Sequence, residues 1–228
     1  VLDDEGRQRR LNLFTELRRQ FLGYDGRFCG FAESFINDSQ TTAEPCEYGL
    51  ALFYHRSLPF FEFYHDFIFG EYKKAPPGGY AERRQNGPLP RNVQAVRLLG
   101  ADGSTFVVCH LHGLWLRAGK MDSPERKIQQ ERLCAFLRRT VHREDKLVLC
   151  GDFNLLPESE TFRALADEFG LRNLIVEHGI NDTRTSFYKK PQRVADYMLV
   201  SPNVEVLSFE VPAEPEVSDH RPLILECR

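Results

Sequence analysis

The stretch Cys150-Gly-Asp-Phe-Asn154 constrains this chain more than any other. It ends an apolar run, Lys146–Cys150, which is typical of a short strand buried on both faces. Alternate residues of an extended backbone share a face, so Asp152 and Asn154 are expected to point the same way at the carboxyl end of a core strand. A carboxylate there can hold a metal or a water, and an amide can donate to an anionic oxygen. The alternative is an ordinary strand-end turn.

Composition agrees with an ordinary globular protein. At 228 residues the chain is long enough for one large domain. The net charge of −3 excludes a general attraction to nucleic acid or acidic membranes, so a site for a polyanion must be a local patch. No apolar run approaches the ~20 residues that a membrane-spanning helix needs. We expect a monomer.

The six cysteines include no Cys-x-x-Cys pair. Cys109, Cys134 and Cys150 lie inside apolar patterns, which predicts small buried side chains. Cys29 and Cys46 lie in loop-like sequence and could form a disulfide if the protein is exported. A reducing, cytoplasmic location is favoured.

Apolar periodicity predicts a strand-rich α/β chain with helices between some strands. Helices are expected over residues 5–22, 123–140 and 157–169. Strands are expected over residues 48–55, 60–69, 93–99, 105–112, 146–150, 193–200, 204–211 and 223–226. This order predicts two packed sheets with helices outside.

Local signals refine these elements. The strands 48–55 and 60–69 are expected to pair around a turn, and 93–99 and 105–112 to form a hairpin. Ser123 and Pro124 mark a helix start, and Ile128 is expected on the buried side of that helix. Residues 73–92 form a basic loop rich in proline and glycine, and loops of this length are usually functional or mobile.

Three polar side chains lie inside predicted apolar strands. His110 and His112 share a face, so they could ligate one metal together. We favour the alternative that one belongs to a site and the other is a hydrogen-bonded core histidine. Asp196 needs a partner, because an unpaired carboxylate in an apolar strand costs several kcal/mol. Asp196 could form an ion pair with a buried arginine, but we expect it to pair with His220.

These side chains form a consistent set for attack of water on phosphorus. An aspartate can hold an imidazole in one tautomer, another can orient water, and an amide or imidazole can donate to the developing negative charge. The set comprises His112, Asp152 with Asn154, Asp196, and Asp219 with His220.

Four segments carry a family resemblance. Leu149–Asn154 looks like a Gly-Asp-Phe-Asn motif, Val217–Leu223 like a Ser-Asp-His motif, Arg193–Tyr197 like an Asp-Tyr strand, and Val108–Gly113 like a strand that ends in an active-site histidine, His112. In order and spacing these segments resemble the endonuclease/exonuclease/phosphatase family over about residues 48–226. The resemblance implies one DNase I-like domain over residues 1–228, an α/β (α+β) two-sheet β-sandwich flanked by helices.

The resemblance also implies a Mg²⁺- or Mn²⁺-dependent hydrolase of phosphoric esters. In such a site, His220, paired with Asp196, would be the general base or a phosphate-stabilising group, and His112 would be the general acid or a phosphate ligand. Asp152 and Asn154 would position water and phosphate. Asp219 would help to bind the metal. The family further places an asparagine and a metal-binding glutamate on two early strands, and this chain contains neither. We expect the natural gene to encode roughly 30–45 further N-terminal residues that supply them.

The favoured substrate is a phosphodiester, with nucleic acid slightly ahead of a phospholipid head group. Arg91, Tyr188 and Arg193, on two basic loops, are the candidate substrate-binding residues, and aromatic rings there could stack on bases. A lipid substrate would require an exposed apolar or aromatic rim, and no loop of that kind is evident. The alternatives are a phosphatase or sphingomyelinase-type member of the family, or a non-catalytic member that binds a phosphorylated ligand or a protein.

Overall fold

A computed structural model describes residues 12–37, 40–74 and 88–228. Its centre is a six-stranded sheet in the order β3-β4-β5-β6-β8-β7. The bounds are β3 Phe60–Phe69, β4 Arg91–Leu99, β5 Thr105–His112, β6 Lys146–Asp152, β7 Arg172–Asn173 and β8 Asp196–Val200. β5 and β6 are parallel and every other pair is antiparallel.

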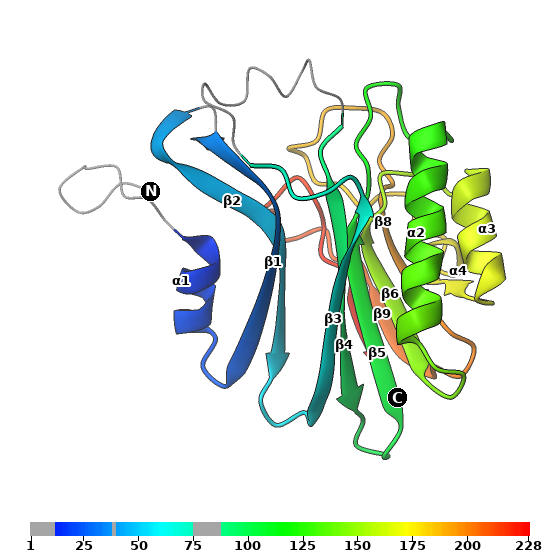
Figure 1. Cartoon of the computed structure of the whole chain (residues 1–228). Coiled ribbons are helices and arrows are strands. Elements are labelled where there is room, and N and C mark those ends of the chain that lie inside the picture. The colour runs from blue at the N-terminus through cyan, green and yellow to red at the C-terminus, as the bar shows by residue number, and fades with distance from the viewer. Residues whose placement is uncertain (1–11, 38–39, 75–87) are drawn as a thin grey trace.

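Three helices lie beside this sheet, α2 Pro124–Thr140, α3 Glu160–Glu168 and α4 Leu174–Glu177 (Figure 1). α2 is the crossover that parallel strands require, and it begins as predicted, because the Ser123 hydroxyl accepts from the Arg126 backbone N–H. Leu133, Phe136 and Leu137 are buried against the sheet. Ile128 is 43% exposed, which contradicts the prediction for this side chain. Gln129 is buried in this helix instead, where its side chain accepts from the Leu114 backbone N–H.

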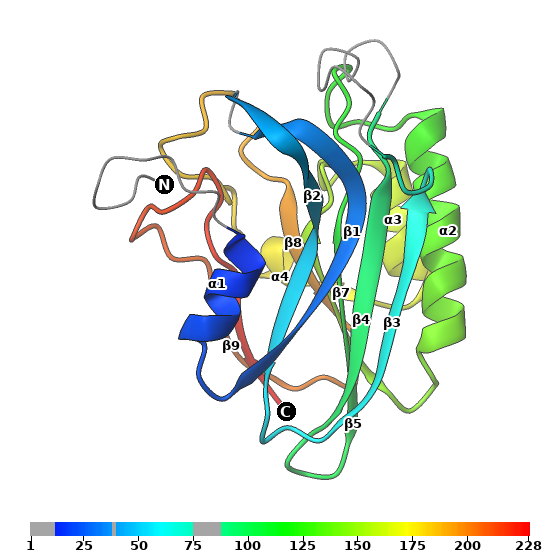
Figure 2. The same cartoon turned by 60° about the vertical axis from the view of Figure 1, so that its left-hand side comes forward.

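The other side of the sheet faces two antiparallel strand pairs and a short helix (Figures 1 and 2). β1 Tyr24–Asn37 pairs with β2 Gln40–His55, and β9 Val206–Glu210 pairs with β10 Ile224–Cys227. α1, Leu13–Gln20, packs its Phe14 ring against Phe28 and Phe53 of the β1–β2 ribbon. The predicted architecture of two strand layers flanked by helices is confirmed.

The N-terminal third differs from the sequence prediction in its pairing. β2 pairs with β1, and β1 was missed because it holds glycines and charged residues in place of an apolar run. The turn at residues 56–59 therefore carries the chain from the ribbon to the main sheet, where β3 pairs with β4. The expected hairpin between 48–55 and 60–69 is wrong.

The structure agrees with some of the other predictions for this region, contradicts others and does not describe the rest. The helix expected over residues 5–22 begins at Leu13, after an Asn12 cap, and residues 1–11 lie outside the described part. Most of the basic loop, residues 75–87, also lies outside it. Cys29 and Cys46 lie in strands, opposite Leu50 and Ser34 respectively, and form no disulfide. No helix in the described ranges is long and apolar enough to cross a membrane.

Candidate active site

The register of the main sheet brings three polar residues into one row. His112 at the end of β5 lies opposite Asp152 at the end of β6, and Asp152 lies opposite Asp196 at the start of β8. Gly151 makes the close approach of β5 and β6 possible. Its φ is +133°, and an added Cβ would lie 2.0 Å from the Leu111 carbonyl oxygen. The glycine before the aspartate is therefore a packing requirement of this site.

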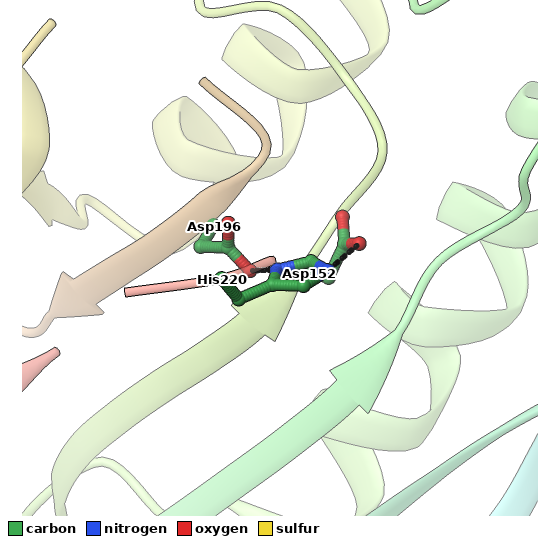
Figure 3. A group of neighbouring side chains, drawn as sticks. All are labelled: Asp152, Asp196 and His220. Carbon is green, nitrogen blue, oxygen red and sulfur yellow. Dashed lines mark hydrogen bonds and ion pairs between the residues drawn. The ribbon is translucent and has the colours of Figure 1, made fainter. Parts of the chain in front are cut away.

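His220 pairs with Asp196, as predicted. Its Nδ1 lies 2.8 Å from Asp196 Oδ1, and the Thr183 hydroxyl donates to Asp196 Oδ2 over 2.7 Å. Figure 3 shows the imidazole between the carboxylates of Asp196 and Asp152. Burial alone would lower the pKa of His220, but the hydrogen bond to Asp196 and the charge of that carboxylate outweigh burial and raise it. The pair has the form of an imidazole base held by a carboxylate.

Asp152 lies between the two histidines. Its Oδ2 is 3.8 Å from Nε2 of His112 and 3.8 Å from Nε2 of His220, and its Oδ1 accepts from the Asn154 backbone N–H over 2.7 Å. Burial, followed by the negative charge of Asp196, raises the pKa of Asp152. A cation close to the two carboxylates would oppose this shift.

His112 and His110 take different roles. Burial and the positive charge of Arg91 lower the pKa of His112, although 43% of its side chain reaches solvent, which moderates the shift. His110 lies opposite Gln94 and contacts its side-chain amide through Nε2. His110 is therefore hydrogen-bonded within the sheet, as the preferred interpretation expects, and His112 lies beside Asp152. The role of His112 as a site residue stays a prediction.

Asn154 does not continue the strand. β6 ends at Asp152, and Asn154 has a left-handed φ of 52°. Its side chain donates to the Gly113 carbonyl over 3.2 Å. The expectation that Asp152 and Asn154 share a face of one extended strand is wrong, because the backbone turns between them. A role of Asn154 toward phosphate stays a prediction.

Arg184 is a site residue that sequence reasoning missed. Residues 183–185 pair with residues 219–221 through backbone hydrogen bonds, so Arg184 lies beside His220. Its guanidinium is 3.3 Å from Asp152 Oδ2, 3.2 Å from Asp219 Oδ2 and 3.8 Å from Asp196 Oδ2. The sequence offered one signal for this residue, the alternative that Asp196 pairs with a buried arginine. Asp196 hydrogen-bonds His220 and also lies within ion-pair distance of Arg184, but it forms no hydrogen bond with the guanidinium.

The candidate substrate residues lie around this centre. The Tyr188 ring is 4.6 Å from the Arg184 guanidinium carbon and 5.3 Å from Lys120 Nζ. Arg193 donates to the backbone carbonyls of Arg184, Thr185 and Tyr188, so it organises the loop that carries Arg184. Arg91 is 5% exposed, and its guanidinium lies over the Phe31 ring at 5.4 Å. Their roles toward a substrate stay predictions.

Lys120 was also missed by sequence reasoning. Its Nζ donates to the carbonyls of Gln192 and Val194, both at 3.1 Å, which ties the loop after β5 to the loop before β8. Burial and the nearby charge of Arg184 lower the pKa of Lys120 to about 8. No local pattern marks a lysine in a loop as buried.

The site contains side chains of the chemical types that bind a divalent cation. Ligand atoms of Asp152, Asp196 and His220 lie within 4.8 Å of one another, and carboxylate oxygens are the ligands that Mg²⁺ and Mn²⁺ prefer. Asp196 is the least suited of these, because its two oxygens already accept from His220 and Thr183. Asp219, the predicted metal ligand, is half exposed and directs Oδ2 toward Arg184.

Comparisons with known proteins agree on the fold. A family model described as the endonuclease/exonuclease/phosphatase family matches residues 3–220. The solved endonuclease/exonuclease/phosphatase of Bacteroides vulgatus is 21% identical with a TM-score of 0.70, over 95% of this chain and 80% of that chain. A Bacteroides thetaiotaomicron mannosyl-6-phosphatase is 17% identical with a TM-score of 0.68, over 94% and 80%. D. rerio TDP2 complexed with a single strand DNA product is 14% identical with a TM-score of 0.58, over 92% and 79%. No curated protein matches by sequence.

Proposed function

The chain belongs to the endonuclease/exonuclease/phosphatase family and has its DNase I-like fold, and from its site we propose that it is a phosphodiesterase that acts on nucleic acid. The observation that carries the proposal is the His220–Asp196 pair, 2.8 Å apart, with Asp152 Oδ2 3.8 Å from the other imidazole nitrogen. Nε2 of this base and Oδ2 of the second carboxylate are close enough to act on the same water molecule, at the position that the Arg184 guanidinium takes in this structure.

In this proposal His220 accepts a proton from the attacking water, and Asp196 stabilises the imidazolium that results. Asp152 orients the water through Oδ2. His112 lies on the other side of Asp152 and donates to the phosphate or to the leaving oxygen. Asn154 contributes to the positioning of phosphate.

A divalent cation, Mg²⁺ or Mn²⁺, would be held by Asp152, which belongs to the cluster of possible ligand atoms, together with Asp219, the predicted metal ligand. When bound it would neutralise phosphate oxygens and make a bound water more acidic.

Exposed side chains around the site support a nucleic acid substrate. Trp115 follows His112 by three residues, is 50% exposed, and has Lys190 Nζ at 5.4 Å from its ring centre. Phe187, on the loop of Lys190, is 57% exposed. Aromatic rings beside cations are the elements with which proteins bind single strands, with stacking worth ~1–3 kcal/mol per base. D. rerio TDP2, with the same fold, is complexed with a single strand DNA product.

A second candidate is a sphingomyelinase-type activity. Trp115, Met121 and Phe187 are exposed on the two loops that Lys120 ties together, and in this candidate function they would supply the apolar rim that was not evident from the sequence. Such a rim could also enter a lipid surface. A phosphatase, as in the mannosyl-6-phosphatase of similar fold, and a non-catalytic phosphate binder are the remaining alternatives.

Binding of a single-stranded oligonucleotide to an Asp152→Asn variant across a salt series tests the proposal. Contact with a few phosphates should give a log–log slope near −0.7 per phosphate neutralised. Trp115→Ala in the same background should weaken binding by ~1–3 kcal/mol if the ring stacks on a base. Phe61→Ala is the matched control, because Phe61 is 53% exposed near the start of β3, far from the site end of that strand. A flat salt response, together with turnover of sphingomyelin by the unmodified chain, would transfer the assignment to lipid.

A further inference from the structure

The guanidinium of Arg184 lies at the centre of the candidate active site. The residue is 3% exposed, and its guanidinium lies among three carboxylates, those of Asp152, Asp196 and Asp219. One such cation does not balance three carboxylates. A guanidinium also presents five N–H donors in a fixed plane and accepts nothing. What those donors contact therefore indicates what the group does.

One donor contacts the imidazole of His220. Arg184 Nη1 lies against His220 Nε2. Because arginine stays protonated, Nε2 must be the acceptor in this contact, so His220 carries its proton on Nδ1 and donates it to Asp196. His220 is thus in the tautomer that a base requires, but its accepting nitrogen is covered. Arg184 has to leave this contact before His220 can take a proton from water.

The guanidinium is incompletely satisfied where it lies. Its Nε atom is buried and has no hydrogen-bond acceptor among the described residues, since Asp196 Oδ2, at 3.8 Å, is beyond reach. One face of the group is supported by the Tyr188 ring at 4.6 Å. A buried, stacked guanidinium with an unused donor matches the forked geometry in which arginine binds two oxygens of a phosphate.

Building on the proposed function, we propose that Arg184 is a catalytic residue that binds the anionic oxygens of the scissile phosphate and, by turning to them, uncovers Nε2 of His220. Substrate binding then releases the base in the same movement. Without phosphate, the guanidinium keeps His220 covered. A merely structural arginine would neutralise the carboxylates equally well but would affect neither phosphate binding nor access to Nε2.

Two measurements on Arg184→Met test this without relying on turnover. The first is the rate at which diethyl pyrocarbonate modifies His220 in the absence of phosphate, read by peptide mass spectrometry relative to the exposed His142. It should rise several-fold in the variant. The second is calorimetric binding of inorganic phosphate at fixed Mg²⁺ concentration. It should weaken by roughly 10- to 100-fold, the loss of a charge-assisted hydrogen bond.

Arg172→Met is the matched control. Arg172 forms a half-exposed pair with Glu177 and lies opposite Val200, at the end of β8 away from Asp196. It should leave both readouts unchanged. If Arg184→Met does not fold, as judged by its thermal transition, Arg184→Lys decides the matter. A lysine keeps the charge but not the fork, so His220 labelling should rise and phosphate binding should weaken.

Unchanged phosphate affinity or unchanged His220 labelling in the folded variant would overturn the role of Arg184. Hydrolysis of bis-p-nitrophenyl phosphate by the unmodified chain is measured separately. Its absence would refute the proposed phosphodiesterase activity, while the labelling and phosphate measurements would still decide whether Arg184 covers His220 and binds phosphate.

Discussion

Replacing Asp196 with asparagine removes one charge from the His220–Asp196 pair while keeping its shape. Asp196 accepts two hydrogen bonds, from His220 Nδ1 at 2.8 Å and from Thr183 Oγ1 at 2.7 Å. An asparagine has only one accepting oxygen. If its NH₂ group faces His220, it forces the proton onto Nε2, which is the wrong tautomer for a base.

The loss can be estimated from the geometry. A carboxylate and an imidazolium with charge centres ~4 Å apart interact by about 4 kcal/mol at an effective dielectric constant of 20. At 1.36 kcal/mol per decade this corresponds to a factor of ~10³ in rate. Asp196 is 6% exposed, so solvent screens the interaction weakly, whereas the nearby Arg184 already offsets part of it. We therefore expect kcat to fall by ~10²–10³.

The pH profile adds a second signature. Asp196 raises the pKa of His220, so Asp196→Asn should lower this pKa. A base must be unprotonated, and the acid limb of kcat should therefore move to lower pH while the plateau falls. The assay is the kcat profile for bis-p-nitrophenyl phosphate with Mg²⁺, from pH 5 to 9.

Asp145→Asn is the matched control. Asp145 is also 6% exposed and pairs with Arg97 at 2.9 Å, just before the start of β6 and away from the site. It should lower the free energy of unfolding without changing kcat. An Asp196→Asn enzyme within ~10-fold of the unmodified kcat, with an unmoved acid limb, would refute the pair as the catalytic base.

Three further outcomes are expected. Arg126→Met should lower the free energy of unfolding by ~3–5 kcal/mol in urea titrations, because this 2% exposed side chain donates to the carbonyls of Leu114, Gly119 and Asn154. A loss under ~1 kcal/mol would contradict this. Burial lowers the pKa of His110 to about 4, from a value near 6.5 in the unfolded state. As the pH drops from 6.5 to 4, the unfolded state therefore takes up a proton that the folded state does not. The free energy of unfolding should fall over this range by up to about 3 kcal/mol. His110→Gln should remove that part of the pH dependence, and an identical curve for both proteins would exclude His110 as its source. EDTA should abolish hydrolysis, and Mg²⁺ or Mn²⁺ should restore it; activity that persists in EDTA would count against a metal-assisted reaction.

Much of the site could be predicted from the sequence, because its members lie in short segments with a strong local pattern. The apolar run before Asp152, the hairpin ending at His112 and the Ser123–Pro124 helix start are local features, and each appears where it was expected. The need of Asp196 for a partner also follows from the sequence, because a charge inside an apolar strand is costly wherever it lies.

The tertiary structure alone decided which residues complete the site. Arg184 and Lys120 lie in polar loop sequence, where a cation is normally solvated, and they are buried only because loops distant in sequence close over them. Strand β1 was missed for a related reason. Its residues lack apolar alternation, and its stability comes from a long register with β2 that no local window contains. Periodicity reports which face of an element is buried. Burial of a charge depends on long-range packing and on the partners that packing supplies, and the sequence alone does not specify these.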